Sequence, residues 1–193
     1  TYTQGQADVG ALMTVTVSYN DGQSTAESAT SAATSAVANV NDDPTGSVAI
    51  SGTATEDQTL SITNTLADED GLGSFSYQWA RAGTAISGAT SATYALVQAD
   101  VGSTITVTVS YTDAQGTAES ATSAATGAVA NVNDSPVVAV SGTATEDQVL
   151  TVSVSDEDGI SGAISYQWAR AGTAINGATS STYTLVQDDV GSA

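Results

Sequence analysis

The chain of 193 residues contains no cysteine, no histidine and no lysine, and its only basic side chains are Arg81 and Arg170. Without cysteine there is no disulfide and no thiolate zinc site, and without histidine there is no imidazole ligand. The metal chemistry that remains is the binding of hard cations by carboxylate, amide and carbonyl oxygens. A catalytic nucleophile would also lack its usual activating bases, so we expect no enzyme; a paired-carboxylate glycosidase is the remote alternative.

The charge of the chain has one sign. Asp and Glu number 21 against two Arg, which gives a formal net charge of −19. Nothing in such a chain can neutralise phosphates, so nucleic acid is excluded as a partner. No apolar run approaches the length that crosses a bilayer and no signal-peptide pattern opens the chain, so we expect no membrane insertion.

Near-identical segments recur along the sequence. SYQWARAGTAI stands at 76–86 and 165–175, SGTATEDQ at 51–58 and 141–148, and NVNDDP at 39–44 returns as NVNDSP at 131–136. This pattern predicts tandem repeats. Residues 44–134 span one complete repeat, preceded by the C-terminal half of another (1–43) and followed by the N-terminal half of a third (135–193). We therefore expect the chain to be a fragment of a longer array.

Within the complete repeat, apolar and polar residues alternate. TITVTVSY at 104–111 places Ile105, Val107, Val109 and Tyr111 on one face, which is typical of a strand. Further strands are expected at 48–51, 59–66, 75–81, 93–96 and 118–132. The last segment is rich in alanine and could be helical, but its Thr and Ser content and Gly127 favour a strand. Short strands with turns between them predict an all-β antiparallel sandwich.

Acidic residues gather in the expected turns and linkers, and in the complete repeat only Glu119 falls within an expected strand. In a sandwich, the N-terminal linker and two of the loops share one pole, while the C-terminal linker and two other loops share the opposite pole. Carboxylates crowded in this way repel one another by roughly 1 kcal/mol per pair at 4 Å even in water, so a cation is expected among them. The alternative is that these residues are solvated and only form turns.

Repeats stacked end to end would bring unlike poles together and supply the six to eight oxygens that Ca²⁺ prefers. Two such junctions are expected. The candidate ligands of the first are Asn39, Asn41, Asp42, Asp68, Asp70 and Asp113, with Asp8 beside them. Those of the second are Glu56, Asp57, Asn131, Asn133, Asp134, Asp156, Asp158 and, last, Asp100, for which a corner hydrogen bond is the preferred role.

Two other residue types have a functional and a structural interpretation. Trp79 and Trp168 could stack on sugars, but a Trp on this strand of a sandwich usually fills the core. Arg81 and Arg170 could hold an anion, but a salt bridge to a nearby carboxylate is preferred.

The motifs also resemble known families. YQW at 77–79 and LVQADVG at 96–102 resemble the strand-C Trp and the Asp-x-Gly corner of immunoglobulin-like domains, although Thr104 and Thr106 stand where Tyr and Cys are usual. The linker resembles the Asp-x-Asn-Asp-Asn-x-Pro calcium linker of cadherins and the VND-x-P boundaries of tandem repeats in large RTX-type bacterial surface adhesins. This likeness implicates Asn41 and Asp42, and equally Asn133 and Asp134; Asn39 and Asn131 replace a cadherin Asp, and the Pro comes one position early.

The adhesin resemblance implies a function. It suggests a calcium-rigidified extender module at the bacterial cell surface, secreted by a type I system, which projects a distal binding domain and whose partners are the neighbouring repeats. The alternative is a repeat that itself binds glycan or a partner protein in cell adhesion. The two half-repeats could also complement each other between chains, head to tail.

Overall fold

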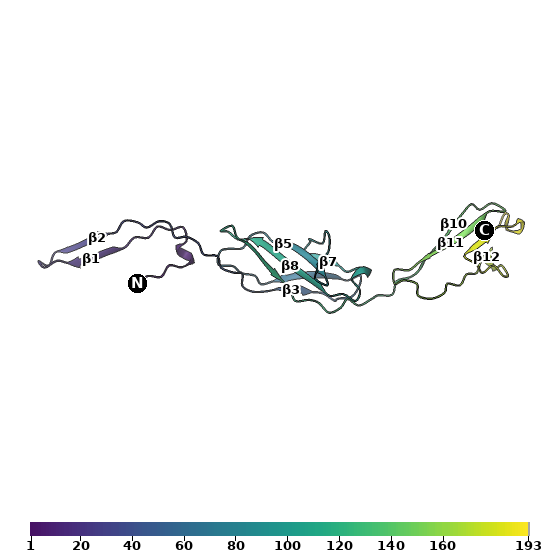
Figure 1. Ribbon diagram of the computed structural model, residues 1–193, viewed down its shortest axis with the longest axis horizontal. Helices are drawn as coiled ribbons and strands as arrows, with labels where there is room; N and C mark the ends of the chain where they lie inside the picture. Colours follow the sequence, from purple (N-terminus) through teal and green to yellow (C-terminus); the bar gives the residue numbers. More distant parts are fainter. Residues whose placement is uncertain (193) are drawn as a thin grey trace. The chain divides into compact units, whose positions relative to one another are not determined.

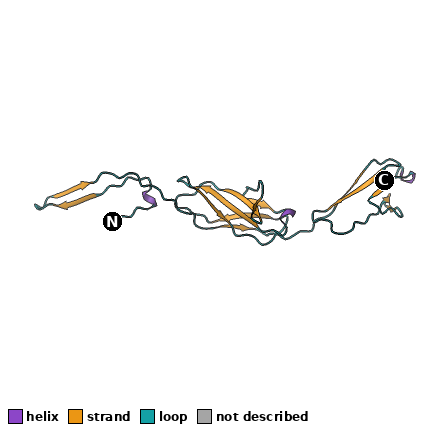
Figure 2. Ribbon diagram, viewed as in Figure 1, coloured by secondary structure: helices purple, strands orange, loops and turns teal. Residues whose placement is uncertain are grey.

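The computed structural model describes residues 1–192. The chain divides into two compact units, Thr1–Ala130 and a second unit that begins at Asn131. In the described residues the only helices are the short 3-10 turns η1 (Gln6–Asp8), η2 (Gln98–Asp100) and η3 (Gln187–Asp189), and none is long and apolar enough to cross a membrane. All strand pairs named below are antiparallel. The predicted all-β class is confirmed, and the arrangement is consistent with a β-sandwich (Figure 2).

The complete repeat in the first unit is built from two sheets (Figure 1). One sheet has the order β3-β4-β7, with bounds Val48–Ser51, Thr59–Asn64 and Thr93–Ala95. The other has the order β6-β5-β8-β9, with bounds Thr84–Ala85, Ser76–Arg81, Ile105–Thr112 and Ala118–Thr122. The predicted strands at 48–51, 59–66, 75–81, 93–96 and 104–111 correspond to β3, β4, β5, β7 and β8, whereas β6 was not predicted.

The core lies between these two sheets. Leu60, Trp79, Ile105, Val107 and Val109 are all 0% exposed. The indole N–H of Trp79 donates to the Ser91 carbonyl at 2.9 Å, and its ring stacks on Tyr94 with centroids 5.7 Å apart. The core position predicted for Trp79 and the inward face predicted for β8 are therefore confirmed.

The expected strand over 118–132 is too long, because β9 ends at Thr122. Beyond that point, backbone N–H groups of β8 donate to side-chain hydroxyls and not to the backbone carbonyls of a paired strand. Ser123 Oγ accepts the Val107 N–H at 3.1 Å, and Thr126 Oγ1 accepts the Ile105 N–H at 3.0 Å. Later, Val129 and Ala130 form single parallel bridges with Val101 and Thr55. The segment remains attached to the repeat, but Ser and Thr side chains interrupt its strand.

The N-terminal part of the first unit contains a separate hairpin. Strand β1 (Thr16–Asn20) pairs with β2 (Ala26–Thr30), and every residue of both strands is exposed.

The second unit contains a three-stranded sheet and a short hairpin. The sheet has the order β10-β11-β14, with bounds Val137–Ser141, Val149–Ser155 and Thr182–Thr184. The hairpin pairs β12 (Ala169–Arg170) with β13 (Thr173–Ala174).

Candidate metal centre

In the first unit, the linker before the complete repeat meets two of its loops. The backbone N–H of Asp42 donates to Asp70 Oδ2 at 2.8 Å, and the N–H of Ala114 donates to the Asp70 carbonyl at 3.2 Å. Gly71 allows this approach: its φ is +92°, and an added Cβ would lie 3.1 Å from the Ala114 Cβ. These contacts bring together the linker at Asp42, the loop at Asp70 and the turn at Ala114. The strand order places these three segments at one end of the sandwich.

Two carboxylates at this pole are buried, Asp70 with 2% exposure and Asp113 with 6%. Asp113 Oδ1 accepts the N–H groups of Gln115 at 2.9 Å and Thr117 at 2.7 Å. Among the described residues, Asp113 Oδ2 and the Asn39 side-chain oxygen are buried and have no hydrogen-bond partner. Buried polar atoms in native proteins are normally paired, because an unpaired one loses its hydration without compensation. Both oxygens therefore have lone pairs available to a cation.

The basic side chains of the protein are engaged elsewhere. Arg81 Nε lies 2.6 Å from Asp100 Oδ1, and Arg170 Nε lies 2.7 Å from Asp189 Oδ1. These ion pairs confirm the preferred prediction for both arginines. Since the sequence contains no other Lys, Arg or His side chain, none remains to neutralise Asp70 and Asp113.

Hydrogen bonds within this pole hold the carboxylates in place. Asp68 Oδ1 accepts the Asp70 N–H at 2.8 Å, and Asp68 Oδ2 accepts the Tyr111 hydroxyl at 2.6 Å. Burial, followed by the contact with Asp68, raises the pKa of Tyr111 far above its ordinary value, so this phenol remains a donor. Asn41 Nδ2 donates to Glu119 Oε1 at 2.9 Å.

Sequence reasoning missed one polar contact of Asp70. Gln6 Nε2 donates to Asp70 Oδ1 at 2.9 Å. The signal that could have identified Gln6 is its recurrence: the 3-10 turn that contains it returns with Gln98 and Gln187 at the same position.

Asp100 is 0% exposed and has the contacts of a corner residue. Besides Arg81, it accepts the Tyr94 hydroxyl and the Val97 N–H, both at 2.9 Å. Asp8 stands at the corresponding place in the N-terminal segment, where it accepts the Gly5 N–H at 3.0 Å and the Tyr2 hydroxyl. These contacts agree with the preferred corner role of Asp100 and do not bring Asp8 to Asp70.

The two acids of the TEDQ turn have different surroundings. Glu56 is 2% exposed, and its backbone N–H donates to the Ala130 carbonyl at 2.9 Å, next to the start of the second linker. Asp57 is exposed and has the left-handed φ of +62° that suits a turn.

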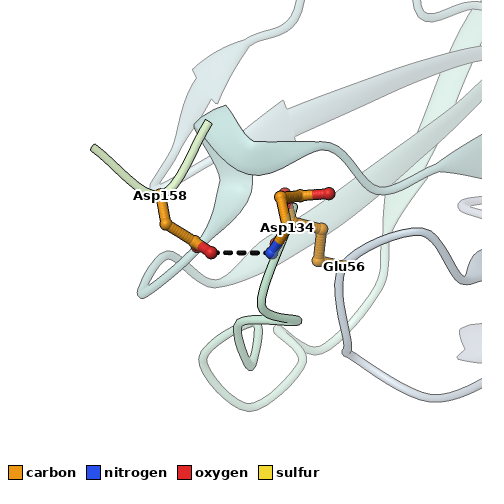
Figure 3. Close-up of side chains that lie close together, drawn as sticks. All are labelled: Glu56, Asp134 and Asp158. Carbon is orange, nitrogen blue, oxygen red and sulfur yellow. Dashed lines mark hydrogen bonds between the residues drawn. The ribbon is translucent and has the colours of Figure 1, made fainter. Parts of the chain in front are cut away.

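The second unit repeats the backbone contact of the first linker. The Asp134 N–H donates to Asp158 Oδ2 at 2.7 Å (Figure 3), and the Asp158 N–H donates to Asp156 Oδ1 at 3.0 Å. Asn131 Nδ2 donates to Asp158 Oδ1 at 2.7 Å, and Asn133 Nδ2 donates to the Asp134 carbonyl at 3.0 Å. The backbone contact of the linker with the DED loop is therefore the same in both units, whereas the side-chain contacts of the linker asparagines differ.

Three carboxylates, those of Glu56, Asp134 and Asp158, could hold a metal ion (Figure 3).

Comparison with known proteins gave no match to this chain among family models, curated proteins or solved structures.

Proposed function

We propose that the chain binds Ca²⁺ where each linker meets the loops of the repeat that follows it, and that it is a calcium-rigidified spacer of a bacterial cell-surface adhesin. The observation that carries the metal proposal is the pair of buried, unpartnered oxygens on Asp113 and Asn39, in a protein with no basic side chain left to neutralise Asp113. The adhesin role rests on the resemblance of the linkers to those of RTX-type adhesins.

The ligand chemistry favours calcium over other ions. The candidate ligands in the first unit are carboxylates, amide oxygens and backbone carbonyls, and the sequence contains no histidine nitrogen and no cysteine sulfur. Ca²⁺ accepts six to eight oxygens in flexible geometry at about 2.3–2.6 Å, whereas Mg²⁺ requires a near-ideal octahedron and keeps several waters. An irregular group of linker and loop oxygens suits the larger ion.

A second site would lie in the second unit and use Asp134 and Asp158, two of the carboxylates that could hold a metal ion. The contacts of Asp134 with Asp158 also repeat those of Asp42 with Asp70. An ion held by the linker and by the loop that the linker contacts would restrict the motion of the linker.

Such binding would couple calcium to stiffness. An ion bound only by the folded, closed arrangement stabilises it by about 4 kcal/mol when free calcium exceeds the dissociation constant a thousandfold. Outside the cell the repeats would be held in line and would project a distal binding domain. The strand surfaces of the repeat are rich in Thr and Ser, which fits a spacer that itself binds no partner.

Calcium titration with a matched pair of variants tests the metal site. In the N-terminal segment, Asp21 Oδ1 accepts the Gln23 N–H at 2.9 Å and the Thr25 N–H at 2.8 Å, the same turn that Asp113 forms. Asp113→Asn and Asp21→Asn therefore change the same kind of turn, but only the first removes a candidate ligand charge.

We expect Asp113→Asn to weaken calcium binding at least about tenfold by isothermal titration, a loss of about 1.4 kcal/mol, and Asp21→Asn to leave it unchanged. In chelator, Asp113→Asn should not lower the melting temperature, because it removes an uncompensated buried charge. Equal affinities for the two variants would contradict the site.

Small-angle scattering tests the spacer role separately. Calcium should narrow the distribution of particle dimensions in the wild-type chain, and chelator should broaden it. Identical profiles with and without calcium, in a protein shown by titration to bind the ion, would contradict rigidification while leaving the metal site intact.

A further inference from the structure

The corner turn of the N-terminal segment, which contains η1, is formed in the same way as the corner turn of the complete repeat. Asp8 accepts the hydroxyl of Tyr2 and the backbone N–H of Gly5. In the complete repeat, Asp100 accepts a tyrosine hydroxyl and a backbone N–H at the corresponding positions. The contacts that shape this turn are thus present in both copies.

Backbone hydrogen bonds attach this corner turn to the start of the linker. The Gly10 N–H donates to the Val37 carbonyl, and the Val37 N–H donates to the Ala11 carbonyl, both at 2.9 Å. The complete repeat has the same kind of parallel bridge, between Val101 and Val129. The chain that enters the linker is therefore held against the corner turn.

The end of the linker is attached to the complete repeat that follows. The Asp42 N–H donates to Asp70 Oδ2 at 2.8 Å, and Asn41 Nδ2 donates to Glu119 Oε1 at 2.9 Å. Between these contacts and the bridge at the start of the linker lie only residues 38–40. Rotation about their φ and ψ angles would make the linker, taken alone, a hinge.

Gln6 connects the two sides of this hinge directly. Its Nε2 donates to Asp70 Oδ1 at 2.9 Å, while the other oxygen of the same carboxylate accepts the Asp42 N–H. The corner turn, the linker and the loop of the complete repeat therefore form a closed ring, in which Asp70 is the common acceptor. A ring closed at a second point restricts rotation about the linker.

Burial makes this contact costly to lose. Asp70 is 2% exposed, and Gln6 is half-buried. A buried carboxylate oxygen that loses its donor is not rehydrated in place, and a hydrogen bond to a charged acceptor is stronger than one between neutral groups. Glutamine also begins the corner turn of each copy, as Gln6, Gln98 and Gln187. Each corner turn thus carries a side-chain amide donor.

We propose that Gln6 joins the corner turn of one repeat to the loop of the repeat that follows it, by donating to Asp70, and that this contact requires no metal ion. The partner of the corner turn is the neighbouring repeat, and the group that it recognises is a buried carboxylate. The candidate calcium ligands of the first unit that lie near Asp70 belong to the linker and to the complete repeat. Gln6 adds a connection to the segment that precedes them.

Pulsed electron paramagnetic resonance tests this contact in the whole chain, in chelator. Because the sequence contains no cysteine, Ser35→Cys and Ser87→Cys place one spin label on the N-terminal segment and one on the complete repeat, both at exposed positions. With Gln6 present we expect one main distance peak. Gln6→Leu should raise the population outside this peak at least about tenfold, as for the loss of a hydrogen bond to a charged group.

Gln4→Leu is the matched control. Gln4 lies two residues before Gln6 and is exposed, so the same substitution there should leave the distance distribution unchanged. Equal distributions for the protein with Gln6 and for Gln6→Leu would overturn the proposal. Equal broadening by Gln4→Leu and Gln6→Leu would also overturn it, because the effect would then not be specific to Gln6.

An exchange of the two side chains separates this contact from a general loss of structure. Gln6→Glu places a second carboxylate against Asp70 and should broaden the distribution. Adding Asp70→Asn should restore the main peak, because the new amide can donate to the new carboxylate while its oxygen still accepts the Asp42 N–H. A double variant as broad as Gln6→Glu alone would overturn the proposal. Since all samples are measured in chelator, the result is independent of the proposed metal sites.

Discussion

The segment TVTVSY occurs twice, at 14–19 and at 106–111, and its two copies have opposite surroundings. In the complete repeat its apolar residues are almost fully buried, whereas in the N-terminal hairpin the same residues are more than half exposed. The pairing register is nevertheless the same in both. Hairpin formation is thus local, while burial requires the second sheet.

The two copies of SYQWAR make the complementary point. Trp79 is completely buried, whereas Trp168 is only partly covered although it stacks on Tyr183, the counterpart of Tyr94. The stacking of Trp168 on Tyr183 and the Arg170–Asp189 ion pair are therefore present without a closed core. What the half-repeat lacks is the hydrophobic burial that β8 supplies.

Substitution of the two tryptophans should give the largest difference between the two regions. Trp79→Ala removes a fully buried ring and should lower the free energy of unfolding of the complete repeat by about 3–5 kcal/mol. Trp168→Ala, in the monomeric protein, should cost much less, because water already contacts its ring. Chemical denaturation followed by circular dichroism measures both, and equal losses would show that Trp168 is buried in solution.

The arginines should give the next largest difference. Arg81→Met leaves the carboxylate of Asp100 buried at 0% side-chain exposure, while Arg170→Met leaves that of Asp189 at 11%. Loss of one partner of a fully buried pair costs about 3–5 kcal/mol; because Arg81 itself is 31% exposed, we expect about 2–3 kcal/mol. Thermal melting should show a smaller loss for Arg170→Met, and the reverse order would contradict the role of burial.

The two tyrosine hydroxyls should give a smaller difference. Tyr111 donates to Asp68 at 2.6 Å near the candidate metal centre, and Tyr19 donates to Glu27 at 2.8 Å in the exposed hairpin. Tyr111→Phe should cost about 1.5 kcal/mol, as for a hydrogen bond to a charged group, and Tyr19→Phe less than about 0.5 kcal/mol. Denaturant midpoints in chelator compare the two without a contribution from calcium.

Protonation of the corner carboxylates of Asp189 and Asp8 should give the smallest difference between the two regions. The pKa of Asp189 is held below 3.8, first by the Val186 N–H and then by Arg170, and that of Asp8 is held below 3.8 by the Gly5 N–H and then by Tyr2. Because both folded-state pKa values are lowered, the stability that these carboxylates contribute is present above the unfolded pKa and is lost as the pH falls through the folded one.

Carbon-detected NMR of the carboxyl groups should therefore find both midpoints below 3.8. Arg170→Gln should move the Asp189 midpoint toward its ordinary value and leave that of Asp8 in place. A common shift of both would indicate a general charge effect and not the specific ion pair.

Much of the fold could be predicted from the alternation and the repeats. The inward residues of β8 and the central Trp79 followed from residue type and spacing, since a strand places every second side chain on one face. A salt bridge of Arg81 to a nearby carboxylate was also predicted, but not that its partner is Asp100. The length of β9 could not be predicted, because nothing in the sequence showed that Ser123 and Thr126 would replace ladder carbonyls with their hydroxyls.

The candidate site was predictable to the level of segments but not of atoms. Strand order was enough to place the Asp42 linker, the Asp70 loop and the Asp113 turn at one pole. It could not identify Gln6 as a partner of Asp70, nor Asp113 Oδ2 as an oxygen without one. Both depend on which groups fill the space around a buried carboxylate.

The sequence by itself determined the strands, the hairpin registers and the corner turns, because these depend on contacts between residues close in the chain and form even in the partial copies. Only the tertiary structure decided which copy of a valine or a tryptophan leaves water, how long the SYQWAR strand becomes and which acidic oxygens lose their hydration. Exclusion of water requires two facing sheets, and one half-repeat supplies only part of them.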